Sequence, residues 1–593
     1  MGKRRSGLPE WAPPAVAVSI YFLLRLPGLL ALPIFCDESV YLRYAQLIAR
    51  APVSRAFLSV VDPKPPLHYW LLALVFRTTS DPLLAARLLS VVAGAVSVLV
   101  LFPLCRELAS LARGAQRKEV GTAPTTDTFA IFASALFVAC PFLVFYQRLA
   151  LAEGLLVLEA LLVAWLSLRW AASAGGPAAR FRREALVLGL ALGAALLTKQ
   201  NFSYVLFGLP VLAVALRPWR DLQPMFRRYA LGFLGILALS ILLFLPYLVV
   251  QPGPPLRDRL FYRATHGGFS GGIASHARIA WDNWRYVFFP TTMTPISPIQ
   301  YEGFRAPAEG GWLWIYLTPP VFLLAVAGLA ALAWLKEYRL LFFLGSWTLL
   351  ALCPFLPFAT VAVPRYAVTV VPPLLFAAAF LLDRVVRGVG RLLGGAFPAR
   401  AAAAVVLLAL SAWPLVSIAD QDTRWDRQRL VRADRWQYVS GWPCGLASRR
   451  TADFLRARAA TGPIVVITTE SLGTPNDVLW TYLDRTRNVS LFFAPWALEA
   501  PILRPVTGQP DRFLLNADLH DLWYRKEVVS VRPDVPIFLV SMDPYPMPDG
   551  KTASADSLLR PRNPQLREVA RFENIPMDLP HRVDSVVVYE LSR

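Results

Sequence analysis

Residues 35–70 read FCDESVYLRYAQLIARAPVSRAFLSVVDPKPPLHYW and lie between a first apolar segment and a long series of others. The stretch begins with two adjacent acids, Asp37 and Glu38. Further on, Lys64 stands between prolines, which restrict the backbone on both sides. Ionisable groups beside a membrane segment are costly to keep, so they are functional candidates. An acid pair at a span end and a cation on a stiff loop together indicate a site that the other spans serve.

The composition indicates a polytopic helical membrane protein. The chain has 593 residues, of which 56% are hydrophobic, and a mean hydropathy of +0.46. It contains repeated apolar runs of about 20 residues, the length that crosses a bilayer as a helix. A net charge of +20 could suggest nucleic-acid binding. The basic residues fall mostly in short loops between apolar runs, which is the positive-inside pattern, so nucleic-acid binding is excluded.

Hydropathy predicts about eleven spans. The first follows Lys3-Arg4-Arg5 but lacks a small-residue cleavage site, so we expect a retained anchor and not a signal peptide. Most loop cations lie inside if the N-terminus is cytoplasmic, and an odd number of spans then places the C-terminal region outside. The expected spans are 13–35, 83–104, 128–146, 151–170, 185–198, 201–216, 229–250, 312–334, 340–358, 366–382 and 399–418.

The spans define a membrane domain, residues 1–418, followed by an extracytoplasmic domain, residues 419–593. Two long external segments interrupt the membrane domain. Residues 35–82 have apolar side chains at helical spacing and predict amphipathic helices lying on the membrane. Residues 251–311 are rich in Pro, Gly and aromatic side chains, which is typical of a functional lid.

The C-terminal domain is predicted to be a small α/β domain, because short apolar runs alternate with helical segments. Thr451 is the expected cap of its first helix. The loop after Ile467 lies where α/β sheets often bind ligands, but a structural loop is the favoured interpretation. The expected helices are 451–460 and 476–483, and the expected strands are 464–467, 489–493, 537–540 and 586–589.

The five cysteines show no CxxC or zinc-type spacing. Cys36 and Cys444 are both expected outside, so a disulfide between them stays open. No Walker loop, G-x-G-x-x-G, H-E-x-x-H or G-x-S-x-G motif is present. The sequence therefore indicates neither a nucleotide fold nor a required metal.

Single cations lie on the expected outer face, three of them at span ends and Lys64 in the first external loop. Each alone could extend its charged group to lipid headgroups, and Asp37 alone could cap a helix. Together, such cations would form an anion site suited to phosphate. A carboxylate facing them could take a proton from an acceptor while the cations stabilise a departing lipid phosphate. The cations are Lys64, Arg148, Lys199 and Arg365, and Glu153 is a further acid or a partner of Arg148.

The motifs Asp37-Glu38-Ser39-Val40-Tyr41 and Lys64-Pro65-Pro66-Leu67-His68-Tyr69-Trp70 resemble the first external loop of the GT-C glycosyltransferases of the protein O-mannosyltransferase and lipid A aminoarabinose transferase type. Later matches are Ala86-Arg87-Leu88, Arg148-Leu149-Ala150, Leu197-Thr198-Lys199 and Arg365-Tyr366. The resemblance covers about residues 13–390. The C-terminal domain does not match the best-known members, and Glu153 stands where the family often has Asp.

The resemblance implies that Asp37 is the general base and Glu38 its neighbour that orients the acceptor or the loop. It implies a polyprenyl-phosphate-linked sugar as donor, with no cofactor and no metal. Lys64, Arg148, Lys199 and Arg365 would bind the lipid phosphate. The residues expected to contact the acceptor or the sugar are His68, Tyr69 and Glu153.

The residues and the resemblance together predict a glycosyltransferase that moves a monosaccharide to a protein, glycan or lipid acceptor. Inversion of the anomeric centre is what the resemblance and a single base imply. A ligase or polymerase of lipid-linked glycans is an alternative enzyme. A transporter or flippase is an alternative of another class, although no internal repeat is evident. The Arg-, Ala-, Leu- and Pro-rich composition favours the plasma membrane of a prokaryote with the site facing outward. In a eukaryote the site would face the lumen of the secretory pathway.

Overall fold

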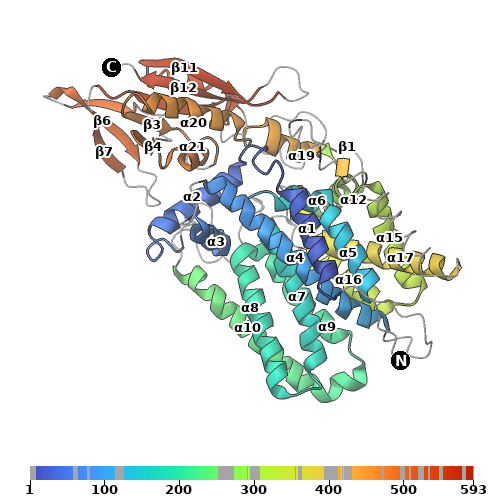
Figure 1. Ribbon diagram of the computed structural model, residues 1–593. Helices are drawn as coiled ribbons and strands as arrows, with labels where there is room; N and C mark the ends of the chain where they lie inside the picture. The colour runs from blue at the N-terminus through green and yellow to red at the C-terminus, as the bar shows by residue number, and fades with distance from the viewer. Residues whose placement is uncertain are drawn as a thin grey trace.

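The computed structural model has a helical part and a smaller C-terminal part built on a sheet (Figure 1). This confirms the predicted class, a polytopic helical protein with a C-terminal α/β domain. The structure describes residues 9–57, 64–76, 81–113, 126–250, 273–289, 292–293, 308–353, 356–357, 363–392, 430–470, 473–494, 501–506, 509–518, 526–531, 534–546, 552–576, 583–591 and a few isolated residues between 412 and 426.

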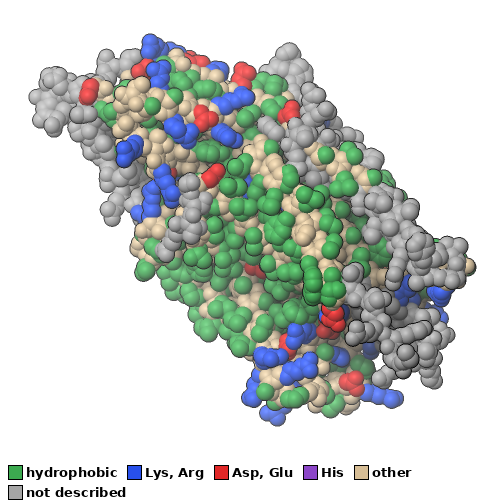
Figure 2. Space-filling view, in the orientation of Figure 1, with side chains coloured by type: hydrophobic (Ala, Val, Ile, Leu, Met, Phe, Trp, Pro, Cys, Tyr) green, Lys and Arg blue, Asp and Glu red, His purple; other side chains and the backbone are tan. Residues whose placement is uncertain are grey.

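Four helical segments in the described part are long and apolar enough to cross a membrane, and they coincide with four predicted spans. Figure 2 shows the hydrophobic side chains that cover the middle of the molecule. The total of eleven spans stays a prediction, because 399–418 lies almost wholly outside the described residues. The four segments are Pro82–Ala112 in α4 (Pro82–Arg113), Glu153–Ser173 in α7 (Glu153–Ser173), Trp219–Val250 in α10 (Trp219–Val250) and Pro364–Leu392 in η3 (Pro364–Val370) with α17 (Val371–Leu392).

Most of the other predicted spans correspond to shorter or broken helices. The run 185–198 lies within α8, which extends beyond it at both ends, and 312–334 divides into α14 and α15. These helices are α1 (Ala12–Arg25), α8 (Ala178–Ser203), η1 (Tyr204–Phe207) with α9 (Gly208–Ala215), α14 (Trp312–Tyr316), α15 (Pro319–Trp334) and α16 (Tyr338–Leu352).

The predicted span 128–146 is a bent pair, α5 (Thr126–Ala139) and α6 (Pro141–Gln147), whose axes differ by 59°. Pro141 has no backbone N–H, so the hydrogen-bond ladder of α5 ends before it. The buried guanidinium of Arg25 donates to the Val138 carbonyl at 2.9 Å, near the break. A buried cation of α1 therefore satisfies a backbone group beside the bend.

The first external segment forms α2 (Cys36–Arg50) and α3 (Leu67–Val75), which pack on each other. Both helices are expected at a membrane surface, but most residues of α2 are buried. The reason is that α21 (Asn476–Leu483) of the C-terminal domain covers α2, which lies between that domain and the membrane helices (Figure 1). Of the second external segment, the structure describes α12 (Ile273–Phe288) and the short strands β1 (Thr292–Met293) and β2 (Ala308–Glu309).

The C-terminal sheet has the strand order β11-β12-β8-β3-β4-β6-β5, with β7 paired to β6. Its centre is parallel, since β3 pairs in parallel with both β4 and β8, and the outer pairs are antiparallel. The strands are β3 (Ile464–Thr468), β4 (Val489–Phe493), β5 (Leu503–Val506), β6 (Gln509–Asp518), β7 (Lys526–Val531), β8 (Ile537–Asp543), β11 (Leu566–Glu573) and β12 (Ser585–Leu591); β9 (Tyr545–Pro546) and β10 (Thr552–Ala553) form a separate pair.

The four predicted strands are present as β3, β4, β8 and β12, and the predicted helix 476–483 is α21 (Asn476–Leu483). The expected cap at Thr451 is wrong. Helix α20 (Leu446–Ala459) begins five residues earlier, and the Thr451 hydroxyl donates to the Ala447 carbonyl at 2.9 Å within it. A buried hydroxyl can bond to the preceding turn, so Thr does not always mark a helix start. The remaining helices are α19 (Arg432–Arg435), η5 (Trp436–Ser440) and α22 (Ala555–Leu559).

The two parts meet at both ends of α2. At its start, Phe35 forms an antiparallel bridge with Cys444. Near its end, Arg43 and Arg50 form ion pairs with Asp484, which follows α21. Cys36 and Cys444 lie close in this junction and are free thiols in the structure, so the disulfide left open above is not formed.

Candidate active site

Asp37 lies in the first turn of α2. The helix starts there because Phe35 is extended, and the Phe35 N–H donates to the Glu38 carboxylate at 2.9 Å. The Asp37 carboxylate pairs with Arg365 at 2.7 Å and with Lys64 at 3.7 Å. Two residues more than 300 positions apart in the sequence thus meet at one carboxylate.

The pKa of Asp37 reflects two opposing effects. Burial raises the pKa, but the charges of Lys64 and Arg365 outweigh burial and lower it from 3.8 to about 2. The side chain keeps 24% of its surface exposed, so an incoming group can reach it. In this state Asp37 is ionised and held by cations.

A second carboxylate extends the cluster. Glu153, at the start of α7, accepts a hydrogen bond from the Lys199 ammonium at 2.6 Å and lies 3.9 Å from the Arg365 Nε. Arg365 therefore bridges the two acids. The structure brings together five residues that the sequence singles out: Asp37, Lys64, Glu153, Lys199 and Arg365.

Lys199 reaches Glu153 from a break in α8. Its backbone angles, φ −157° and ψ 83°, are not helical. The Ser203 hydroxyl has one proton to donate, and the Ala195 and Lys199 carbonyls lie within reach of it at 2.6 and 2.9 Å, so it helps to satisfy groups that the break frees. The predicted separation between the spans 185–198 and 201–216 thus corresponds to a kink that positions a cation.

Aromatic rings lie beside each cation. The Lys64 ammonium is 4.8 Å from the ring centre of Tyr41. Lys199 is 5.3 Å from Tyr366, and Arg365 is 5.2 Å from Phe35. Such contacts attract cations and restrict their side chains.

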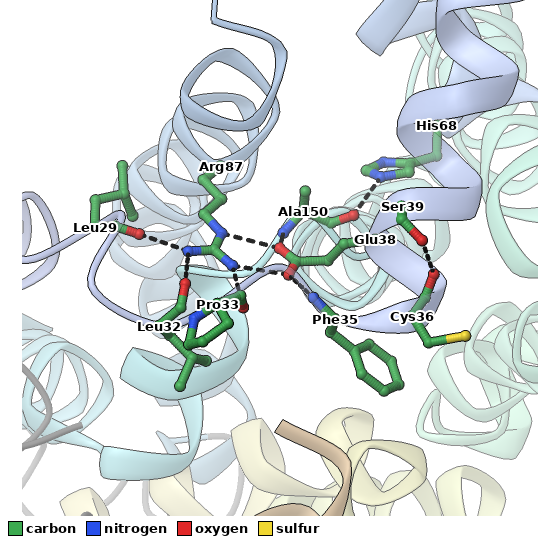
Figure 3. Close-up of polar contacts among 10 residues, drawn as sticks. All are labelled: Leu29, Leu32, Pro33, Phe35, Cys36, Glu38, Ser39, His68, Arg87 and Ala150. Atoms are coloured by element: carbon green, nitrogen blue, oxygen red, sulfur yellow. Dashed lines mark hydrogen bonds and ion pairs between the residues drawn. The ribbon is translucent and has the colours of Figure 1, made fainter. Parts of the chain in front are cut away.

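Glu38 is wholly buried next to Asp37 and has a different role (Figure 3). Its carboxylate forms two hydrogen bonds with Arg87, at 2.8 and 3.0 Å, and accepts the N–H groups of Phe35 and Ala150. Both oxygens are engaged, so this side chain fixes the loop. The expected role of Glu38, orienting the acceptor or the loop, stays a prediction, and these contacts favour the loop.

Arg87 is saturated in the same network. Beyond Glu38, its guanidinium donates to three backbone carbonyls between α1 and α2. This buried, fully hydrogen-bonded pair fixes where α2 starts. The carbonyls belong to Leu29, Leu32 and Pro33.

Three other predicted site residues lie away from an accessible surface. Arg148 is 7% exposed and donates to the Pro27 carbonyl, beside α1. His68 lies 3.3 Å from the Ala150 carbonyl, and burial lowers its pKa to about 4, so the ring is neutral. Tyr69 is 2% exposed and packs against Tyr41. Their contacts support the loop, and the sugar or acceptor contacts expected for His68 and Tyr69 stay predictions.

The structure also brings in residues that the sequence gave no reason to choose. Tyr438 of η5 packs on Phe35 with ring centres 4.5 Å apart. Asp434 of α19 accepts hydrogen bonds from the hydroxyls of Tyr146 and Tyr316. No motif marks Asp434 or Tyr438, and both lie beyond the region of family resemblance. Within the described residues, no group of three or more His, Cys, Asp or Glu is arranged to hold a metal ion.

No known family profile matches the chain, and no curated protein matches its sequence. Its fold is similar to that of ArnT from Cupriavidus metallidurans in the apo state, with a TM-score of 0.51 and 16% identity over 97% of both chains. A weaker match is the mycobacterial arabinofuranosyltransferase AftD, with a TM-score of 0.43 and 15% identity over 99% of this chain and 40% of that one. Another is the S. cerevisiae protein O-mannosyltransferase Pmt1-Pmt2 complex bound to the sugar donor, with a TM-score of 0.31 and 19% identity over 41% of this chain and 33% of that one.

Proposed function

We propose that this chain, whose fold is that of the GT-C membrane glycosyltransferases, moves a monosaccharide from a polyprenyl-phosphate donor to an acceptor hydroxyl or amine. The observation that carries the proposal is the Asp37 carboxylate held by Lys64 and Arg365 at one end of the membrane helices. A carboxylate that is partly exposed, next to cations that could hold a phosphate, supplies the two functions this reaction needs.

The charge balance of the cluster fits a lipid phosphate. Lys64, Lys199 and Arg365 contribute three positive charges, and Asp37 and Glu153 contribute two negative ones. One positive charge remains, which matches the single charge of a phosphodiester donor. When the bond to the sugar breaks, the phosphate gains a second negative charge, and the same cations stabilise it.

The ion pairs also suggest how the base becomes active. A carboxylate with a pKa of about 2 is a weak base. A bound phosphate competes with Asp37 for Lys64 and Arg365. As the contacts of these cations with Asp37 weaken, the effect of burial prevails and the pKa of Asp37 rises. Donor binding would thereby convert Asp37 from an ion-pair partner into a base.

The proposed reaction is a single displacement at the anomeric carbon. The acceptor oxygen or nitrogen bonds to that carbon while the bond from the carbon to the phosphate oxygen breaks. Asp37 takes the acceptor proton, and the lipid phosphate leaves with the bonding electrons. One displacement inverts the anomeric configuration.

The placement of the site agrees with the proposed topology. Lys and Arg side chains lie at both ends of the molecule, over the C-terminal domain and at the opposite end of the membrane helices, with hydrophobic side chains between them (Figure 2). If that opposite end is cytoplasmic, the site and residues 419–593 face outward from the plasma membrane of a prokaryote. The segment 251–311 and the C-terminal domain would then select the protein, glycan or lipid acceptor.

The test measures sugar release by the purified protein in lipid nanodiscs, using synthetic undecaprenyl-phosphate pentoses and hexoses. Asp37→Asn should abolish release while the fold persists. Asp81→Asn is a matched control, because Asp81 belongs to the same external segment and caps α4 by accepting a hydrogen bond from the Leu84 N–H at 3.0 Å. Turnover that survives Asp37→Asn would remove Asp37 as the base. Failure to bind undecaprenyl phosphate at all would refute the proposed function.

A further inference from the structure

We propose that Tyr438 and Asp434 form, with Arg365 and Glu153, the subsite that recognises the sugar of the donor. The two residues come from the segment that joins the membrane helices to the C-terminal domain. The inference rests on the proposed function and adds to it a specificity element outside the first external segment.

Tyr438 lies directly beside the candidate phosphate site. Its ring contacts Phe35 at 4.5 Å between centres and Phe145 at 5.1 Å. The guanidinium of Arg365 lies 5.2 Å from the centre of the same Phe35 ring. One aromatic ring thus separates a tyrosine from the cation that holds Asp37. The sugar of a bound donor must lie next to its phosphate, which places it in this neighbourhood.

Several polar atoms here lack a hydrogen-bond partner among the residues that the structure describes. They are the Tyr438 hydroxyl, Asp434 Oδ1, Glu153 Oε2, and Nε and Nη1 of Arg365. Tyr438 is 1% exposed, Asp434 0% and Glu153 1%. Buried polar groups in native proteins are hydrogen-bonded with few exceptions. Other buried polar atoms of the described chain also lack a partner, the Tyr589 hydroxyl among them, but here such atoms from several segments lie beside the cation that holds Asp37, where one polar ligand would satisfy them together.

The mixture of donors and acceptors identifies the ligand class. Arg365 offers N–H donors, the two carboxylate oxygens are acceptors, and the Tyr438 hydroxyl can do either. A second phosphate would be repelled by Asp434 and Glu153. Sugar hydroxyls both donate and accept, and the rings of Phe35 and Phe145 supply apolar surface for the C–H face of a sugar.

Asp434 is held in place for such a role. The hydroxyls of Tyr146 on α6 and Tyr316 on α14 both donate to its Oδ2. These bonds fix the carboxylate and the segment that carries it, while Oδ1 remains available. The subsite is therefore rigid and assembled from elements far apart in the sequence, as specificity sites require.

The test compares the affinity of undecaprenyl phosphate with that of its pentose and hexose derivatives for the full-length protein in nanodiscs. The measured quantity is the gain in affinity that the sugar adds. Tyr438→Phe removes only the hydroxyl, so the affinity for undecaprenyl phosphate should stay the same and the sugar-dependent gain should fall about tenfold. Tyr589→Phe is the matched control, because Tyr589 is 0% exposed and its hydroxyl also lacks a partner within the described chain, but it lies in β12.

Deoxy derivatives of the tightest-binding sugar complete the test. One of them, lacking the hydroxyl that Tyr438 contacts, should bind the wild type and Tyr438→Phe equally. An unchanged sugar-dependent gain in Tyr438→Phe would overturn the inference, as would an equal loss in Tyr589→Phe. A wild type that binds undecaprenyl phosphate but gains nothing from any sugar would also overturn it and leave the phosphate site intact. Only a wild type that fails to bind undecaprenyl phosphate would refute the proposed function itself.

Discussion

The pair formed by Glu38 and Arg87 leads to a prediction that separates a positioning role from a chemical one. Glu38→Gln should destabilise the protein and lower activity together. The carboxylate accepts four hydrogen bonds, two of them from a guanidinium that is itself wholly buried. The substitution replaces one oxygen by an NH₂ group that faces donors, and it leaves the charge of Arg87 buried without its counter-ion.

Removing one partner of a buried ion pair costs about 3–5 kcal/mol. Arg87 keeps its three hydrogen bonds to backbone carbonyls, so we expect the lower end, about 3 kcal/mol. The double variant Glu38→Gln with Arg87→Met removes the unpaired charge. Its cost should be smaller than the sum of the single costs by about 0.5–3 kcal/mol.

The assay is reversible denaturation of the protein in mild detergent, followed for the four members of this double-variant cycle, with activity measured on each folded sample. Asp81→Asn serves again as the control in the same external segment. Activity and stability should fall together in Glu38→Gln and recover in part in the double variant. Wild-type stability with activity reduced more than a hundredfold would show that Glu38 contacts the reacting groups, and it would refute the positioning role.

Three further predictions follow from other contacts. Asp484→Ala removes the partner of Arg43, so hydrogen exchange in α2 should become faster while α4 keeps its protection. The pKa of Asp37 is below the ordinary value, so its ion pairs stabilise the fold fully above about pH 4, and this stabilisation is lost as the pH falls through about 2. If donor binding weakens the ion pairs, the pKa of Asp37 rises in the complex, and the acidic limb of kcat should lie at higher pH than that of kcat/KM. Gly328→Ala should lower the free energy of unfolding by about 1–3 kcal/mol in a denaturation assay, because the added methyl group would lie 2.1 Å from a backbone carbonyl oxygen of α17. Gly345→Ala is the control: no atom lies within 4 Å of its added methyl group, so it should stabilise α16 by about 0.5–1 kcal/mol.

Much of the fold could be predicted because membrane spans and buried strands leave strong local signals. The apolar run at 83–104 and the strand 489–493 depend on composition within a single segment. The bend between α5 and α6 was not predicted. It depends on Pro141 within an otherwise apolar run and on a cation of another helix, Arg25, that satisfies a carbonyl near the break.

The same distinction between local signals and tertiary contacts applies to the candidate site. Lys64 could be predicted because prolines on both sides restrict its backbone. Asp37, Lys199 and Arg365 could be predicted, since an isolated charge at a span end is costly and therefore conspicuous in a sequence. The same rule also selected Arg148, whose charge has a different partner, the Pro27 carbonyl. Sequence shows that a charge is present but not which group it faces.

The position of Asp37 depends on contacts at both ends of α2. At the start, the bridge between Phe35 and Cys444 and the pairing of Glu38 with Arg87 fix the backbone from two directions. Arg43 in the middle of the helix pairs with Asp484 at 3.5 Å, and Arg50 at its end pairs with the same carboxylate, so the C-terminal domain also determines the axis of the helix. Asp37 contacts two cations that lie outside α2, at 2.7 and 3.7 Å, so a small rotation of α2 would break these pairs. The C-terminal domain is therefore part of the frame that aligns the carboxylate with its cations, and a chain ending after α17 would lose that alignment even though it keeps the site residues known from sequence.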